Sequence, residues 1–297
     1  MDPVSTQAAP LLAAARSFER ILVASALDDS GRRALRRALR VPLARGARLE
    51  ILHVRSPWPS RRRPQEPEVR RSLAEALAEA GEVARDLGLL ELQLVVRVAE
   101  GWPAREIVRA AWRARAELIV VGPPAVRFDG TPRGTIARLL RWAELPVLVV
   151  RREASGEHRR VLCAVDRTIA AAGTAELASR LAPSRPLTLF HAYNVPFESW
   201  LGSAPELEDE ARGYLQDLAR ELDPAVRIDR TIVAPGDPCV RIVRAAEAER
   251  ADLVVVGTRG RAGLARSLSA SAAEWVLASA PVDVAVARRH GLALSRG

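Results

Sequence analysis

The chain repeats itself, and this repetition is the strongest constraint on its fold. The segment RILVASALDDS at 20–30 is matched by RVLCAVDRTIA at 160–170, about 140 residues later. Further on, EGWPAREIVRAAWRARAELIVVG at 100–122 is matched by PGDPCVRIVRAAEAERADLVVVG at 235–257, with IVRAA and a Gly-x-Pro turn in the same register. We therefore expect a flexible tail over 1–17 and two copies of one domain, over 18–152 and 153–297, which is compatible with a length of 297 residues.

Within each copy, short apolar runs alternate with longer segments of helical periodicity. Runs such as Leu253–Val256 are apolar throughout, which is typical of strands buried on both faces of a parallel sheet. The helical stripes comprise Val69, Leu73, Leu77, Ala80 and Ala84 in the first copy, and Leu207, Ala211, Tyr214, Leu215, Leu218 and Leu222 in the second. This order predicts an α/β fold made of two tandem, doubly wound, Rossmann-like parallel sheets of about five strands each.

The composition excludes several chemistries. The sequence has no lysine, so all 45 basic residues are arginine and the net charge of +9 is fixed at physiological pH. Walker P-loops, Schiff-base enzymes and pyridoxal enzymes all need a lysine. Aromatic residues make up only 4% of the chain, too few for a base-stacking platform, so nucleic acid is not an expected partner.

Other familiar signals are missing from the sequence. Two cysteines make no disulfide framework, and we find no signal peptide and no run approaching 18 apolar residues, so we expect a cytoplasmic protein without a membrane segment. The four histidines show no metal-ligand spacing, and no nucleophile elbow occurs, so we assign no metal site and no catalytic residue. Cys239 follows Pro238 at a predicted helix start, where a thiolate would be stabilised. The Pro- and Arg-rich segment Ser56–Ser72 is typical of a loop.

Ligands of open parallel sheets bind beyond the carboxyl ends of the strands. The candidates in the second copy are Asp166 after the first strand, His191 and Ala192 after the second, Gly236–Asp237 after the third, and the segment 257–271 after the fourth. An aspartate in such a place is also a common helix cap, and a helix is predicted to begin near Thr168.

The segment 257–271 has spaced glycines at 257, 260 and 263 and precedes a helix predicted over 272–278. Glycine lets backbone N–H groups approach an anion, and a helix N-terminus adds unpaired donors, so a phosphate chain is the natural ligand. Three arginines, Arg259, Arg261 and Arg266, could add charge-assisted contacts.

The order VLCAVD, LFHA, GDP and VVGTRGRAGLARSLSASAAEWVLASAPVDVAVAR resembles the universal stress protein family, whose fold is adenine-nucleotide alpha-hydrolase-like. The resemblance runs from about residue 18 to 290 and implies a tandem, two-domain member. ATP-binding members carry G-x2-G-x9-G-[ST] after the fourth strand. Here Gly257 and Gly260 match the first two glycines, Ala270 replaces the third, and Ser271 keeps the hydroxyl.

The resemblance also implies a ligand and the residues that hold it. It makes ATP the cofactor, with or without Mg²⁺, and places adenine against the Asp166 carboxylate and the backbone of Ala192. The triphosphate would lie on the backbone around Gly257, Gly260, Ala270, Ser271 and Ala272. The methyl group of Ala270 costs little at a negative φ and about 1 kcal/mol or more at a positive φ, and we expect ATP binding to survive it.

The first copy has lost the same features. Ala26 stands where the second copy has Asp166, and Pro123 and Pro124 offer no N–H group to a phosphate. Ala125 replaces the second glycine, and only eight residues, instead of nine, separate Ala125 from Gly134. We expect this copy to be a degenerate scaffold.

Three functional hypotheses remain open. The first is an ATP-binding regulatory stress-response protein, not an enzyme, with the nucleotide in its second domain and an unknown protein partner. The second is a nucleotide-free interaction module with both sites vestigial. The third is a slow ATPase. Family members commonly pair through their fifth strands, so the resemblance implies a homodimer or pairing of the two copies within one chain.

Overall fold

The structure is a computed structural model that describes residues 17–57, 65–123, 134–194, 204–258 and 270–288. Internal contacts divide the chain into two compact units, with described residues up to Glu157 in the first and from His158 in the second. The predicted tail over 1–17 lies outside the described residues except for Ser17.

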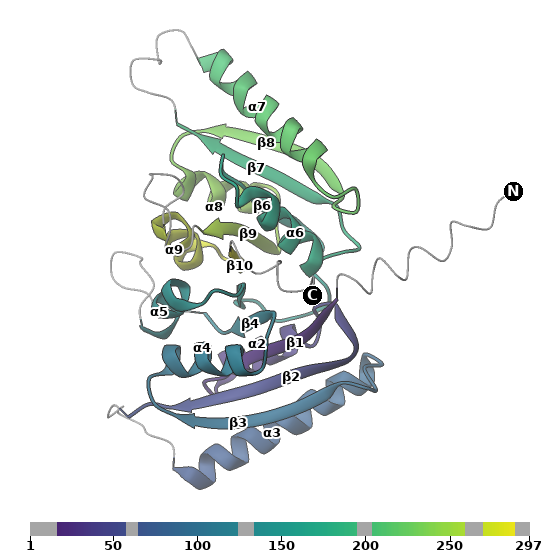
Figure 1. Ribbon diagram of the computed structural model, residues 1–297, viewed down its shortest axis with the longest axis vertical. Coiled ribbons are helices and arrows are strands. Elements are labelled where there is room, and N and C mark those ends of the chain that lie inside the picture. Colours follow the sequence, from purple (N-terminus) through teal and green to yellow (C-terminus); the bar gives the residue numbers. More distant parts are fainter. Residues whose placement is uncertain (1–16, 58–64, 124–133, 195–203, 259–269, 289–297) are drawn as a thin grey trace, which may run out of the picture. The chain divides into compact units, whose positions relative to one another are not determined.

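Each unit alternates strands and helices in the predicted order (Figure 1). The first contains β1 (Phe18–Ala24), α2 (Asp29–Ala38), β2 (Leu43–Arg55), α3 (Glu66–Asp86), β3 (Gln93–Glu100), α4 (Pro103–Arg113), β4 (Leu118–Val121), α5 (Gly134–Trp142) and β5 (Val147–Val149). The second contains β6 (Val161–Ala164), α6 (Ala171–Leu181), β7 (Leu187–Tyr193), α7 (Ala204–Glu221), β8 (Ile228–Pro235), α8 (Pro238–Ala248), β9 (Leu253–Thr258), α9 (Ala270–Ser279) and β10 (Asp283–Arg288).

The strand order is β3-β2-β1-β4-β5 in the first unit and β8-β7-β6-β9-β10 in the second, with parallel pairing within each. The chain builds outward from the first strand to the third, then returns to the other side of the first strand. Because crossovers are right-handed, the helices before and after this return cover opposite faces of the sheet. In the first unit α2 contacts α3 and α4 contacts α5, and Figure 1 shows α4 on the near side of the sheet. The predicted doubly wound α/β class is confirmed.

Strands near the middle of each sheet contain long buried runs, which explains their apolar sequence. All four residues of β4 are buried, and so are Leu253–Val256 of β9. The helical stripes pack on these sheets, with one exception: Leu77 is 38% exposed, and Ala76 takes its place in the core. Within the stripe of α7, Ala211, Leu215 and Leu218 are buried.

Helix α3 begins earlier than the sequence indicated. It starts at Glu66, inside the segment read as a loop, with Pro67 in its first turn. Proline lacks a backbone N–H group, but in the first turn that group has no partner within the helix, so proline is tolerated there. The Gln65 side chain and Glu68 complete a capping box.

One glycine in each unit is fixed by helix packing at the end of the fourth strand. A Cβ atom at Gly257 would lie 2.7 Å from Thr174 Oγ1 on α6, and a Cβ atom at Gly122 would lie 2.7 Å from Ser30 Oγ on α2. Real Cβ atoms do not approach oxygen so closely, so a larger residue at either position would force the Thr174 or Ser30 side chain, or its helix, to move. The shared VVG sequence therefore has a packing reason in both copies.

We expect Gly257→Ala to lower the free energy of unfolding by about 1–3 kcal/mol, because the added methyl group overpacks the α6–β9 contact. The double variant Gly257→Ala/Thr174→Ala should recover most of this loss relative to Thr174→Ala alone, since the first unit carries Ala34 at the position of Thr174. Urea unfolding of the four proteins measures the coupling. Strict additivity of the two substitutions would contradict the packing explanation.

Candidate functional site

The second unit brings three predicted residues to the carboxyl edge of its sheet. Strands β7, β6 and β9 are neighbours, with Ala164 in register with Phe190 and Val256. Two positions further along each chain segment lie Asp166, Ala192 and Thr258, and Gly257 precedes the last of these. This edge is the reversal point of the strand order, where open α/β sheets bind ligands.

Asp166 does not cap a helix. Helix α6 begins at Ala171, not near Thr168 as expected, and its N-cap residue Ala170 makes no side-chain cap. The Thr168 hydroxyl donates to Asp166 Oδ1 at 2.6 Å, and the Thr168 N–H donates to the Asp166 carbonyl at 2.7 Å. Among the described residues, Thr168 supplies the only hydrogen bond to this half-buried carboxylate, so Oδ2 keeps its capacity to accept another.

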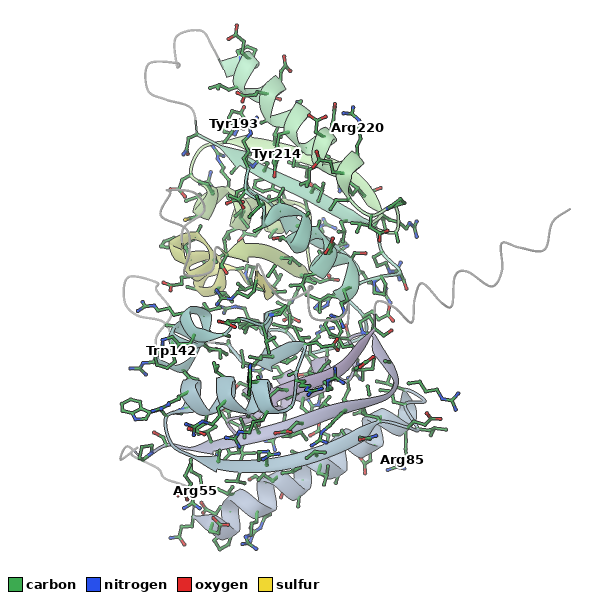
Figure 2. The ribbon with its side chains drawn as sticks, viewed as in Figure 1. Arg55, Arg85, Trp142, Tyr193, Tyr214 and Arg220 are labelled. Atoms are coloured by element: carbon green, nitrogen blue, oxygen red, sulfur yellow. The ribbon has the colours of Figure 1, made fainter. Side chains whose placement is uncertain are left out.

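Tyr214 of α7, labelled in Figure 2, contacts both Asp166 and His191 at this edge of the sheet. Its hydroxyl donates to the Asp166 carbonyl, and its ring meets the His191 ring edge to face, with centroids 5.2 Å apart. The Arg167 guanidinium lies 5.5 Å from the same ring and also pairs with Glu210 of α7. Burial raises the pKa of the Tyr214 hydroxyl, so it stays protonated and remains a donor. Tyr214 thereby fixes the backbone that carries the Asp166 carboxylate.

The sequence analysis placed Tyr214 in the helical stripe and missed this contact. The repeat nevertheless contained a signal for this tyrosine. When the two copies are aligned so that His191 matches His53, Tyr214 matches Ala76, so the tyrosine occurs in the second copy only. Asp166 is paired with Ala26 in the same comparison. The first unit therefore has alanine at both positions and lacks the carboxylate and the tyrosine hydroxyl.

The two histidines at the ends of the second strands serve the fold. His191 Nδ1 lies 2.9 Å from the Val165 carbonyl, and His53 Nδ1 lies 2.9 Å from the Ser25 carbonyl. Burial is the main cause that lowers the pKa of His191, so the ring is neutral at physiological pH. Both units have this strand-to-strand contact, so it belongs to the shared fold and does not indicate a ligand site in either unit.

The predicted phosphate segment is only partly described. Gly260 and Arg259, Arg261 and Arg266 lie outside the described residues. Ala270 and Ser271 open helix α9, two residues before the predicted start, and Ala272 is buried. The N-terminus of a helix thus follows the segment.

The equivalent edge of the first unit is built differently. Ala26 is exposed, and Asp28 caps α2 by accepting from the Gly31 N–H group at 2.9 Å. Pro124 and Ala125 lie outside the described residues. The acidic side chain of this loop therefore caps a helix, unlike Asp166 in the second unit.

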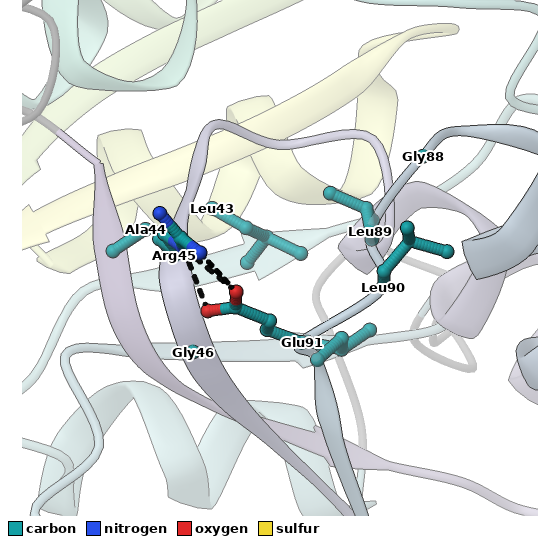
Figure 3. Close-up of a pocket in the computed structure, with 9 residues that line it drawn as sticks. Leu43, Ala44, Arg45, Gly46, Gly88, Leu89, Leu90 and Glu91 are labelled. Carbon is teal, nitrogen blue, oxygen red and sulfur yellow. Dashed lines mark hydrogen bonds and ion pairs between the residues drawn. The ribbon is translucent and has the colours of Figure 1, made fainter.

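A cavity of about 380 Å³ lies at the other edge of the first sheet, where β2 and β3 begin (Figure 3). It is lined by Leu43–Gly46 and Gly88–Leu92, and Arg45 forms a two-pronged ion pair with Glu91 at its rim. Ligands of parallel sheets bind at the opposite edge, and this cavity contains none of the predicted site residues.

The predicted stabilisation of a Cys239 thiolate is wrong. Asp237 caps α8 through the Cys239 N–H group, at 2.7 Å. Burial and the neighbouring Asp237 carboxylate raise the pKa of the Cys239 thiol to about 11. The negative charge that caps the helix opposes a second negative charge on sulfur.

The described residues contain neither a candidate metal site nor a membrane-spanning helix. No group of histidine, cysteine, aspartate or glutamate side chains in the described part of the chain could hold a metal ion. No described helix is long and apolar enough to cross a bilayer.

Comparison with known proteins identifies relatives of both units. The model of the Universal stress protein family matches residues 17–151 and 157–288. A universal stress protein from Mycobacterium tuberculosis is 34% identical over 186 residues, which cover 58% of this chain and 62% of that relative. The chain thus spans less than two thirds of the length of the curated relative.

Two solved structures share the fold. A universal stress protein from Archaeoglobus fulgidus is 16% identical with a TM-score of 0.64, and the match covers 91% of this chain and 98% of that one. A functionally unknown protein from Pseudomonas aeruginosa is 19% identical with a TM-score of 0.61, covering 92% and 93%.

We expect Cys239 to resist alkylation in the folded protein. With a pKa of about 11, the thiolate fraction at pH 8 is more than about 100-fold below that of an ordinary cysteine. Iodoacetamide labelling followed by mass spectrometry should show a rate that keeps rising up to about pH 11, and Asp237→Asn should shift that rise to lower pH. A rate that levels off near pH 8 would contradict this assignment.

Proposed function

Since the chain belongs to the universal stress protein family, we propose that its second domain binds ATP and that occupancy regulates contacts with a protein partner. The observation that carries the proposal is the pair formed by Asp166 and Tyr214, which the second unit has and the first unit replaces with Ala26 and Ala76. The Tyr214 hydroxyl holds the backbone at position 166, and the Asp166 side chain offers the carboxylate. The first unit has neither the tyrosine that positions this backbone nor the carboxylate, which supports a ligand site in the second unit only.

The Asp166 carboxylate suits adenine. The exocyclic N6 amino group of adenine is a donor, whereas the O6 atom of guanine is an acceptor that a carboxylate repels. Thr168 occupies Oδ1 and so orients Oδ2 for this contact. The backbone of Ala192, at the end of the adjacent strand, is the second proposed adenine contact.

The triphosphate would extend from this edge towards the start of α9. Gly257 and Gly260 lead into the segment, and Ala270, Ser271 and Ala272 supply N–H groups of the first helical turn. Arg259, Arg261 and Arg266 add positive charge to the same segment. The sequence from 257 to 272 contains no carboxylate, so any Mg²⁺ would be held mainly by the nucleotide.

This arrangement favours regulation over catalysis. No proposed site residue is placed to act as a general base towards a terminal phosphate, so a slow ATPase is a weaker candidate. The nucleotide-free interaction module remains the alternative from another class, and pairing into a homodimer or within one chain is compatible with either.

Isothermal titration should show at most one ATP site per chain, with GTP at least about tenfold weaker because of the carboxylate at position 166. Asp166→Ala should remove ATP-dependent thermal stabilisation. The matched control is Ala26→Asp, which places an aspartate in the first unit and should create no second site. Two ATP sites per chain, or no binding of any adenine nucleotide, would contradict the proposal. If Asp166→Ala binds ATP as tightly as the wild-type protein, Asp166 does not contact the nucleotide.

We expect Tyr214→Phe to weaken ATP binding by about 3- to 10-fold, because loss of one hydrogen bond of about 1 kcal/mol loosens the Asp166 backbone. Tyr193→Phe removes the hydroxyl of the other tyrosine labelled in Figure 2 and should leave the affinity unchanged. Affinity and thermal stability are measured together. If Tyr214→Phe lowers the thermal stability but not the ATP affinity, Tyr214 stabilises the fold and does not support the site.

A further inference from the structure

Three of the six tryptophans lie on one helical layer of the first unit and are exposed. Trp102 precedes α4, Trp112 lies near its end, and Trp142, labelled in Figure 2, ends α5; their exposed fractions are 43%, 81% and 47%. Tryptophan is usually well buried, and exposed apolar groups of this size mark interaction sites. The three exposed tryptophans therefore indicate an interaction surface on this layer.

The tryptophans are interleaved with arginines along one face of α4. Exposed residues recur at positions 102, 105, 109, 112 and 113, which is the spacing of a single helical stripe. They read Trp102, Arg105, Arg109, Trp112 and Arg113. Two indoles ten residues apart are separated by roughly 15 Å, or about three helical turns. We call this stripe, together with Arg138, Arg141 and Trp142 of α5, the Trp/Arg face.

Contacts between α4 and α5 hold the face together. The Arg138 guanidinium lies 5.7 Å from the centre of the Trp102 ring, a cation–π arrangement that joins the two helices. The two helices also contact each other along their length, and each has a buried side, which includes Ile107 in α4 and Leu139 in α5. Trp102 is therefore presented by a fixed framework.

The face carries a marked charge excess. Helices α4 and α5 contain five arginines and a single acidic residue, Glu106, which is mostly buried and pairs with Arg109 at 3.1 Å. Arginine and tryptophan are, with tyrosine, the side-chain types enriched at the energetic centres of protein interfaces. A ligand for this face must combine carboxylates with apolar groups.

The second unit provides an internal comparison. In the repeat, Trp102 corresponds to Asp237, which caps α8, and Trp112 corresponds to Glu247 within α8. Arg138 corresponds to Glu274 of α9. Helices α8 and α9 contain two arginines and two glutamates, so they have no charge excess. The same scaffold thus folds without this face, and the tryptophans are not required by the fold.

We propose that the Trp/Arg face of α4 and α5 is a docking surface for an acidic, apolar helical segment of another protein. Its occupant packs apolar side chains on Trp102 and Trp112 and sets carboxylates against Arg105 and Arg113. The stripe lies on the exposed side of one helix, whereas single-stranded nucleic acid is usually tracked by a positively charged groove, so a protein segment is favoured. The proposal does not depend on nucleotide binding by the second domain.

Fluorescence anisotropy with the full chain tests this directly. The probe is a labelled peptide of about four helical turns, with leucine and phenylalanine on one face and glutamate on the other. The control peptide carries lysine in place of glutamate. We expect the acidic peptide to bind, to weaken with salt, and to bind at least tenfold better than the basic peptide. Failure of the acidic peptide to bind at low salt overturns the proposal.

Variants locate the binding. Trp112→Glu and Trp102→Asp introduce the residues that the repeat carries and so should fold, and each should weaken binding by about 30-fold, as expected for central interface residues. The matched control is Leu90→Glu, because Leu90 is 83% exposed but lies between α3 and β3. Equal weakening by Leu90→Glu would show that net charge is responsible and would overturn the assignment.

Two further measurements test other occupants. If a labelled single-stranded or duplex oligonucleotide binds more tightly than the acidic peptide and Trp112→Glu abolishes it, the face is a nucleic-acid surface and the proposal is wrong. If sedimentation shows that the chain self-associates and Trp112→Glu disrupts this, the occupant is a second copy and the proposal is likewise wrong. If Trp112→Glu changes neither self-association nor oligonucleotide binding but weakens binding of the acidic peptide, the proposed occupant is supported.

Discussion

Burial of the central strands on both faces determines where chemistry can occur in this protein. Strands such as β4 and β9 have helices above and below them, so a charged side chain in their interior would lie in the core without water. Functional groups are therefore confined to strand ends and to the outer faces of the helices. Asp166 and the Trp/Arg face are examples of these two places.

Duplication of this scaffold gives the protein an internal reference. Features present in both units, such as the His53 and His191 contacts, belong to the fold. Features present in one unit only, such as Tyr214 against Ala76 or Trp112 against Glu247, have been gained or lost without loss of the fold. The two units have diverged in opposite ways: the second keeps a polar site at its sheet edge, and the first displays aromatic and basic groups on its helices.

The sequence predicted the α/β class, the duplication and the order of elements because hydrophobic periodicity and repetition encode them directly. It could not predict contacts that depend on a side chain reaching across the fold. Tyr214 lies in an apolar stripe, and only the three-dimensional arrangement brings its hydroxyl to the Asp166 carbonyl. The pKa of Cys239 likewise reflects burial and the Asp237 cap together, whereas a helix start alone indicates the opposite shift.

The packing of Gly257 against Thr174, and of Gly122 against Ser30, bears on how such sequences are interpreted. The neighbouring helix leaves little room for a larger residue at the end of the fourth strand, whether or not a ligand is bound there. The same constraint acts in both copies, although the residues that follow this glycine differ. The glycine therefore reports the packing of the fold, and its presence alone does not indicate a ligand site.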